Sequence, residues 1–324
     1  MKTEKSLDAT DTPRWLSGKS KARLYMQVEM KQSTNKRHIA RVLCIVLAIF
    51  LFLSGAELLY SAYALTVSRY TVRSGKVGGA IRVAFLSDLH GREFGEDNSR
   101  LLSRITSEQP DLIALVGDIF NRNADADEID RMCTFIWRAS EIAPVYFSLG
   151  NHEAGCLRNN GSDLLDRVRS CGAIILESDY LDIEINGTSL RIGGYMGYYR
   201  QPVMTTDDIA QEERELAFMD AFESADCFKL LLNHIPTGWL EWKGRNKFPV
   251  DLVLSGPYHG GQIRIPILEQ GLYAPNIGWF PRFTKGLFEG SQATCILTTG
   301  LAGSRLPRFF NPPEIAVVDI LPAE

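Results

Sequence analysis

The sequence predicts a layered α/β domain that follows one membrane-spanning helix. The domain is predicted from short β-branched runs that alternate with longer amphipathic segments between Ile81 and Ile320. Such alternation of strand and helix patterns is typical of a sheet whose faces are covered by other layers. The helix is predicted from the apolar stretch Val42–Leu65, which exceeds the ~20 residues needed to cross a bilayer.

Residues 1–41 form a basic segment that we expect to be a cytoplasmic tail, disordered or loosely helical. Its cationic side chains are Lys19, Lys21, Arg23, Lys31, Lys36, Arg37 and Arg41. Because positive charge beside a span is retained in the cytoplasm, the domain is predicted to be extracytoplasmic. Glu57 would lie near the far interface, where its carboxylate reaches water. Tyr60 and Tyr63 fit the aromatic belt at that interface.

Two other interpretations of the apolar stretch stay open. The run Val42–Ala56 could belong to a cleaved signal peptide, although a basic region of about 40 residues before it is long for one. It could also be a buried core helix, although no polar residue alternates along the run. In the anchored interpretation, the chain divides into a tail (1–41), a transmembrane anchor (42–65), a linker (66–79) and one domain (80–324).

The composition excludes several other classes of protein. Apolar residues make up 45% of the 324 residues and charged residues 23%, which is ordinary for a globular protein. The net charge of −4 gives no indication of nucleic-acid binding. The six cysteines show no CxxC spacing, so neither a disulfide scaffold nor a zinc knuckle is expected.

Polar residues suited to catalysis follow five of the predicted strands. They occur in the segments Asp88-Leu-His90, Gly117-Asp118, Gly150-Asn151-His152-Glu153, Asn233-His234 and Gly256-Pro-Tyr-His259. In an open α/β sheet, ligands collect outside the carboxyl ends of the strands. One convergent site is therefore the simplest explanation of the pattern.

The histidines strengthen this expectation. The chain has five, of which His38 lies in the basic tail and the other four lie at these strand ends. A structural role is the better interpretation of any single histidine, but not of four beside Asp and Asn at strand ends. Carboxylate, imidazole and amide ligands together suit Mn, Fe or Zn at a hydrolytic centre.

This set of motifs resembles the calcineurin-like metallophosphoesterases over residues 80–320. The motifs are D-x-H, G-D, G-N-H-E, a later lone His and G-x-x-H-G-G-Q. The resemblance implies a two-sheet α/β sandwich flanked by helices. The segments from Gly260 to Arg264, from Gly271 to Pro275 and from Pro312 to Ile315 also resemble a membrane-associated bacterial branch. That branch includes phosphodiesterases with lipid-linked or cell-envelope substrates.

The resemblance also implies a role for each site residue. Asp88, His90 and His259 would bind one divalent metal ion, Asp118 would bridge two, and Asn151 and His234 would bind the second. His152 would be the catalytic residue, stabilising charge on the phosphate or protonating the leaving oxygen. A hydroxide held between the two ions would attack phosphorus in line. Arg92 is a candidate substrate-binding residue, and a solvated surface arginine is the alternative.

Pro257 departs from the family pattern, which usually has a histidine ligand of the second metal at this position. Proline offers no side-chain donor atom and restricts the backbone of the loop. Three outcomes are open: a weak second ion, one tight ion or a substitute ligand such as Tyr258 or Glu153, or a binding protein that no longer hydrolyses. Aromatic residues in the C-terminal third could form a lipid-binding rim or pack in the core: Trp239, Trp242, Trp279, Phe280 and Phe283.

Overall fold

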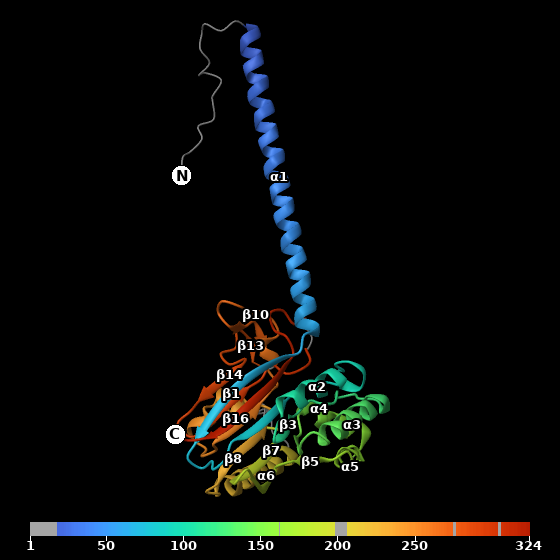
Figure 1. Ribbon diagram of the computed structural model, residues 1–324, viewed down its shortest axis with the longest axis vertical. Coiled ribbons are helices and arrows are strands. Elements are labelled where there is room, and N and C mark those ends of the chain that lie inside the picture. Colours follow the sequence, from blue (N-terminus) through green and yellow to red (C-terminus); the bar gives the residue numbers. More distant parts are fainter. Residues whose placement is uncertain (1–17, 162, 198–205, 275–276, 304–305) are drawn as a thin grey trace. The chain divides into compact units, whose positions relative to one another are not determined.

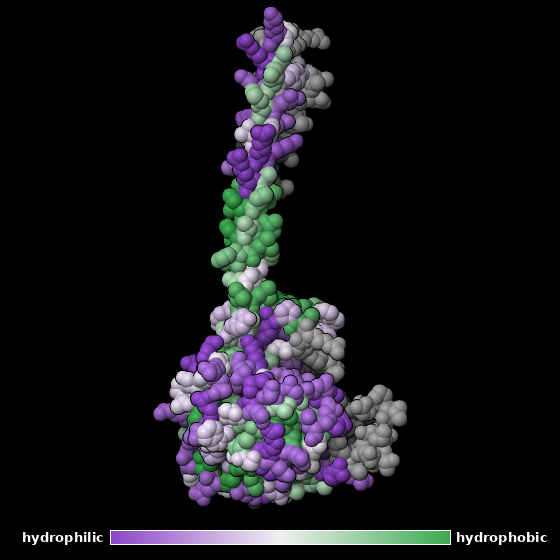
Figure 2. Space-filling model, turned by 90° about the vertical axis from the view of Figure 1, so that its right-hand side faces the viewer, coloured by the Kyte–Doolittle hydropathy of each residue, from purple (hydrophilic) through white to green (hydrophobic). Residues whose placement is uncertain are grey.

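The computed structural model describes residues 18–161, 163–197, 206–274, 277–303 and 306–324 (Figure 1). The chain divides into two compact units, Met1–Ala56 and Glu57–Glu324. Helix α1, Gly18–Tyr63, forms the described part of the first unit, and its last turns belong to the second. The part Tyr25–Tyr63 is long and apolar enough to cross a membrane. Figure 2 shows the apolar band along this helix.

The second unit contains a first six-stranded sheet with the order β1-β16-β2-β3-β4-β5. Strands β2 to β5 are parallel, and β16 is antiparallel to β2. The strands are β1 (Thr66–Ser74), β2 (Ile81–Leu86), β3 (Leu112–Val116), β4 (Val145–Ser148), β5 (Ala173–Leu176) and β16 (Glu314–Pro322). Strand β1, near the start of the unit in the sequence, pairs in parallel with β16, near its end. The first sheet therefore contains both terminal segments of the unit.

A second six-stranded sheet has the order β14-β15-β9-β8-β7-β6. Its middle strands, from β15 to β7, are parallel, and both edge strands are antiparallel to their neighbours. The strands are β6 (Asp179–Ile185), β7 (Thr188–Tyr195), β8 (Phe228–Asn233), β9 (Leu252–Ser255), β14 (Gly286–Glu289) and β15 (Thr294–Leu297). The hairpin expected at Asn186-Gly187 connects β6 to β7, and both of its turn residues have positive φ.

Helices and two small hairpins complete the unit. The helices are α2 (Ser99–Glu108), α3 (Ala126–Ser140), α4 (Asn151–Asn160), α5 (Asp163–Ser170), α6 (Thr206–Glu223) and α7 (Thr237–Leu240), with 3-10 turns at η1 (Glu96–Asn98), η2 (Gly244–Asn246) and η3 (His259–Gly261). The hairpins pair β10 (Arg264–Ile265) with β11 (Gln270–Gly271), and β12 (Tyr273–Ala274) with β13 (Gly278–Trp279).

Alternating side chains of the strands produce three apolar layers. In β2, Val83 and Phe85 face the other sheet, while Ala84 and Leu86 pack with the residues of α2 and α3. In β8, Leu231 points away from the first sheet, into a third cluster that includes residues of α6 and α7. Since successive residues of a strand point to opposite faces, each central strand contributes to two layers. This confirms the predicted sandwich of two sheets flanked by helices.

The range 66–79, expected as a linker, contains strand β1 of the first sheet. Most of its residues are polar and they do not alternate strictly, so the strand has only a weak periodic signal. Its partner β16 lies about 250 positions further along the chain, as in the pair Thr66 and Glu314. The strand therefore follows from a pairing that local sequence does not reveal.

Candidate metal centre

The strand ends of both sheets bring the expected residues together. Asp88 follows β2, Asp118 follows β3, and Asn151 and His152 begin α4 directly after β4. From the second sheet, His234 follows β8, and His259 begins η3 after β9. Because these strands are parallel within each sheet, their carboxyl ends open onto one region of the domain.

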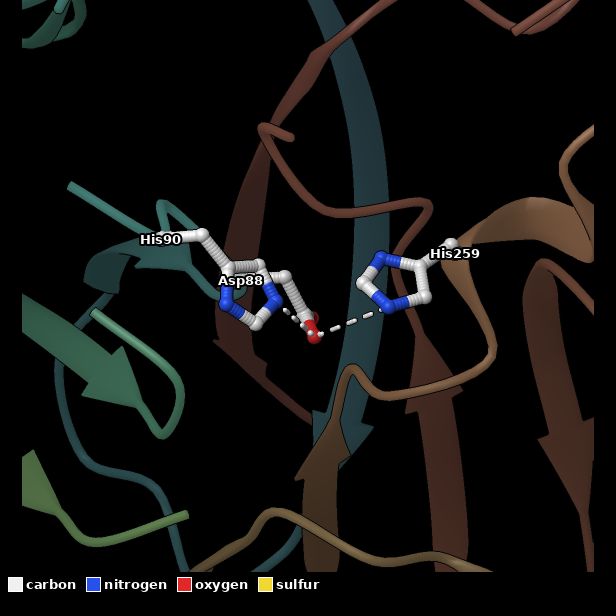
Figure 3. Close-up of side chains that lie close together, drawn as sticks. All are labelled: Asp88, His90 and His259. Carbon is white, nitrogen blue, oxygen red and sulfur yellow. Dashed lines mark ion pairs between the residues drawn. The ribbon is translucent and has the colours of Figure 1, made fainter. Parts of the chain in front are cut away.

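One cluster of possible ligands consists of Asp88, His90 and His259 (Figure 3). The Oδ1 atom of Asp88 lies 3.8 Å from Nε2 of His90 and 3.8 Å from Nε2 of His259. Two donor atoms that bind the same ion, each at about 2.0–2.2 Å from it, lie roughly 3–4 Å from one another. The spacing of these three side chains therefore fits one divalent ion.

A second cluster consists of Asp88, Asp118 and His234, so it shares Asp88 with the first. The Oδ2 atom of Asp118 lies 3.3 Å from Nε2 of His234, 3.9 Å from Nε2 of His90 and 4.0 Å from Nε2 of His152. The Asp118 carboxylate thus lies among imidazoles of both clusters, the position that a bridging ligand needs.

Several polar atoms of the two clusters are buried without a hydrogen-bond partner. They include Oδ1 of Asp88, Nε2 of His234 and Nδ1 of His259. A buried polar atom without a partner costs about 1–3 kcal/mol, so such atoms are rare unless they bind something. At Asp88 and His234 these are the atoms that line the clusters. The donor set and its unsatisfied atoms together fit divalent metal ions.

Four of the site residues have left-handed backbone conformations. The φ angles are 56° at Asp88, 49° at His90, 55° at Asp118 and 46° at His259. Each such residue costs about 1–3 kcal/mol and is retained only where neighbouring structure fixes it. Here the loops bond to one another beyond the strands, as in the N–H of Asp88 to the carbonyl of Gly117 (3.0 Å) and of His90 to that of Asp118 (3.0 Å).

Glu153 holds the Asp118 loop through hydrogen bonds to its backbone. Its side chain is fully buried and accepts four backbone N–H groups. Oε2 accepts from Asp118 and Gly150, and Oε1 accepts from Ile119 and Phe120, all at 2.7–2.9 Å. Burial raises the pKa of this carboxyl to about 7, with a further contribution from Asp118, although the amide donors oppose the shift. Glu153 therefore supports the site and does not replace the missing ligand.

The ionisation of the site follows from burial and mutual charge. Burial raises the pKa of Asp88 to about 7, and burial lowers that of His90 to about 4. The pKa of His259 is also well below its usual value, first because of burial. Burial opposes charge on both His234 and Asp118, but their attraction prevails. The pKa of His234 is raised to about 10, and the pKa of Asp118 lies below its ordinary range.

Hydrogen bonds to ring nitrogens determine which atom each imidazole presents. Nδ1 of His234 lies 2.8 Å from the carbonyl oxygen of Val116, so it carries a proton and leaves Nε2 facing Asp118. His152 is different, because its Nδ1 accepts the backbone N–H of Arg122 at 3.2 Å. The neutral ring of His152 therefore carries its proton on Nε2. Asn151 lies beside it as the first residue of α4.

The loop around Pro257 is tightly packed. A Cβ atom at Gly256 would collide with Oγ of Ser87 and lie 2.6 Å from Oδ2 of Asp88, so only glycine fits there. Tyr258 is fully buried in the third apolar cluster, and its hydroxyl lies 3.1 Å from Oγ1 of Thr237. Tyr258 is thus placed in the core, and the expectation of a substitute ligand fails for it as it does for Glu153.

Asn311 is a supporting residue that the sequence did not reveal. Its side chain is buried, and Nδ2 donates to the carbonyls of His259 (2.7 Å) and Gln262 (3.0 Å). Its own N–H donates to Oγ of Ser61 at 3.0 Å. Ser61 in turn donates to Glu57, which accepts the N–H of Phe310 at 3.0 Å. The last turns of α1 therefore support the loop that carries His259.

Arg92 lies at the same junction. Its guanidinium donates to the carbonyls of Leu301 and Ala62 and lies 4.6 Å from the ring centroid of Phe94. It therefore connects the end of α1 to the loop after β15.

Comparison with known proteins agrees with this geometry. The model of the family described as calcineurin-like phosphoesterase matches residues 81–260, more than half of the chain. The uncharacterized metallophosphoesterase YkuE of Bacillus subtilis is 23% identical over 77% of this chain and 83% of its own length. The uncharacterized metallophosphoesterase Cj0846 of Campylobacter jejuni is 26% identical, over 74% of this chain and 59% of its own length.

A further relative is named for its reaction. The phosphodiesterase YaeI of Escherichia coli is 22% identical over 74% of this chain and 82% of its own length. All residues of the candidate ligand groups lie within the range of the family match. The chain belongs to the calcineurin-like phosphoesterase family and is a metal-dependent phosphoester hydrolase.

Proposed function

We propose that the protein is a membrane-anchored phosphoesterase whose catalytic domain is extracytoplasmic. Its substrate is a phosphodiester or phosphomonoester of the cell envelope, and this class includes lipid-linked phosphoesters carried at the membrane surface. The observation that carries the proposal is the pair of ligand clusters that share Asp88. Mn, Fe and Zn are the ions that this mixture of carboxylate and imidazole suits.

Each cluster supports one ion in this proposal. Asp88, His90 and His259 would hold the first, and Asp118 and His234 would hold the second, with Asp118 also close to His90. Asn151, the first residue of α4, stays the candidate further ligand of the second ion. Divalent ions bound there supply Lewis acidity toward the phosphoryl oxygens and lower the pKa of bound water. The residues contribute rigidity, because backbone hydrogen bonds hold Asp88, His90 and Asp118 in conformations that isolated chains rarely adopt.

His152 acts on the leaving group. It is the most exposed of the four site histidines, with 30% of its side chain accessible, so a substrate can reach it. Its Nδ1 accepts the N–H of Arg122, and the Nε2 proton therefore points away from that bond. An Nε2–H group beside the clusters can donate to the leaving oxygen as the phosphoester bond breaks. Substrate contact by Arg92 stays a prediction.

Membrane anchorage is supported by the length and apolarity of Tyr25–Tyr63. The orientation is supported by the basic residues that precede Val42 in the sequence, since positive flanks stay in the cytoplasm. An extracytoplasmic domain on such an anchor meets envelope phosphoesters at the membrane surface, which is the reason for assigning that substrate class.

The test compares hydrolysis of an aryl phosphodiester and an aryl phosphomonoester with Mn²⁺ by the wild type and Asp118→Asn. We expect Asp118→Asn to lose turnover while it stays folded. Asp182→Asn is the matched control, because Asp182 is an exposed residue of β6 that pairs with Arg191. Unchanged turnover in Asp118→Asn would refute the assignment of the metal site.

One observation favours a second candidate function, that of a metal-dependent binding protein that no longer hydrolyses. Pro257 occupies a position where the family usually has a ligand, and neither Tyr258 nor Glu153 replaces it. Metal content and turnover of the wild type and Pro257→His, measured side by side, separate the two. A silent wild type together with an active variant would establish the binding role.

A further inference from the structure

Five large apolar side chains are exposed on one part of the second unit. The exposed fractions are 94% for Ile267, 69% for Leu268, 66% for Trp279, 61% for Phe280 and 43% for Phe310. We call these residues the apolar rim. Each buried apolar side chain gains about 1.5–3 kcal/mol relative to an exposed one, so a cluster of this kind marks a surface that is covered.

Backbone contacts show that the rim is one surface. The N–H of Arg264 donates to the carbonyl of Phe309 at 2.9 Å, which joins the β10 hairpin to the segment before Phe310. The N–H of Phe280 donates to Leu272 at 2.8 Å, and the rings of Trp279 and Tyr273 are 5.4 Å apart. Figure 1 shows the β10 and β13 hairpins at the same end of the second unit.

The rim continues directly from the end of α1. The N–H of Phe310 donates to Glu57 at 3.0 Å, and that of Asn311 donates to Ser61. A span of ~20 residues that begins at Val42 ends near Ser61. Leu59, at 63%, is still exposed on this last part of the helix. Phe310 therefore lies beside the residues at which a span of this length would end.

We propose that the apolar rim inserts into the lipid interface around the end of α1. The inference relies on the membrane anchorage proposed above and adds a second, surface-bound attachment. Lipid is the occupant that the contacts favour, because the rim begins at the residue where the apolar helix leaves the bilayer. Tryptophan and phenylalanine are also side chains suited to this interface, where amphipathic and apolar groups lie at headgroup level.

Insertion of the rim fixes the orientation of the metal centre. Asn311 bonds to both Ser61 and the carbonyl of His259, so the loop that carries His259 is attached to the segment that bears Phe310. The metal clusters are thereby held at a constant height above the lipid. A phosphoester carried in the headgroup layer meets the site without leaving the membrane.

The test measures quenching of tryptophan emission by a lipid spin label. Full-length protein is reconstituted in phosphatidylcholine–phosphatidylglycerol vesicles with and without 5-doxyl phosphatidylcholine. We expect most of the lipid-dependent quenching to be lost in Trp279→Phe and to return when Leu268→Trp is added. Trp137→Phe is the matched control, because Trp137 is 53% exposed on α3, outside the rim.

Three outcomes separate the rim from the other proposals. Equal quenching in the wild type and Trp279→Phe, in protein that resists extraction with alkaline carbonate, would overturn insertion of the rim and leave the anchor intact. Release of the protein by carbonate would overturn the anchor and the rim together. Turnover of a soluble aryl phosphoester by the same samples reports on the metal centre separately, and we expect Trp279→Phe to retain it.

Discussion

Replacing Glu153 with glutamine tests how the Asp118 loop is held. The carboxylate accepts two backbone N–H groups on each oxygen. A glutamine has the same shape but only one oxygen, so its –NH₂ group would face two N–H donors. Two buried donors lose their acceptors, which costs about 1–3 kcal/mol each. We therefore expect Glu153→Gln to lower the free energy of unfolding by roughly 2–6 kcal/mol.

The same change is expected to weaken metal binding. Asp118 has a left-handed backbone conformation, and the hydrogen bond from its N–H to Glu153 helps to hold it there. The assay is guanidinium unfolding of the full-length protein in detergent micelles, followed by tryptophan fluorescence at pH 8, with Mn²⁺ affinity measured on the same sample. Glu128→Gln is the matched control. Glu128 is half-buried. Its Oε1 accepts the N–H of Asn121, and its Oε2 accepts the side-chain amide of Asn121.

The control is expected to lose only about 1–3 kcal/mol. A glutamine oxygen still accepts the N–H of Asn121, and the side-chain amide of Asn121 loses one acceptor but keeps the carbonyl of His90. If Glu153→Gln unfolds within that margin of the wild type, the four amide contacts do not support the loop. If it unfolds early but binds Mn²⁺ with unchanged affinity, Glu153 stabilises the fold and does not position Asp118.

Two further changes follow from the same contacts. Asn311→Asp removes the donor to the carbonyls of His259 and Gln262, so we expect a loss of about 2–6 kcal/mol of stability with weaker metal binding. Ser61→Ala, which removes one acceptor of Asn311, should cost only about 1–3 kcal/mol, and an equal effect of both changes would contradict this order. Proton release offers a third test. Burial lowers the pKa of His234, but Asp118, Asp88 and the hydrogen bond to Val116 together raise it to about 10 in the metal-free protein, so a bound ion must displace a proton from this ring. Between pH 7 and pH 8.5 the apparent Mn²⁺ affinity should therefore rise about tenfold per pH unit, and His234→Gln should flatten the slope in calorimetric titrations.

Much of the site could be predicted because its signals are local. Five candidate ligands lie within a few residues of the end of an apolar run, and the edge of a parallel sheet is where such residues converge: Asp88, His90, Asp118, His234 and His259. The two-sheet fold and the family are confirmed. The roles of Asn151 and His152 and the expected topology stay predictions.

What escaped prediction depends on residues far apart in the chain. Strand β1 exists because Thr66 pairs with Glu314, and Asn311 meets Ser61 across 250 positions. Tyr258 and Glu153 were candidates for a substitute ligand in one of the three open outcomes, but the structure places Tyr258 in the core and directs Glu153 onto backbone amides. The spacing of the motifs does not indicate where either side chain points.

The sequence by itself predicted the candidate ligands and their order along the chain, because these depend on residue type and on position after a strand, and the family resemblance identified the departure at Pro257. Only the tertiary structure decided which atoms meet. It placed the carboxylate of Asp118 among three imidazoles, assigned Glu153 to the loop beneath it, and made the end of α1 part of the support for His259. The physical reason is that such contacts arise from the packing of two sheets, which brings distant segments together and leaves no periodic trace in either one.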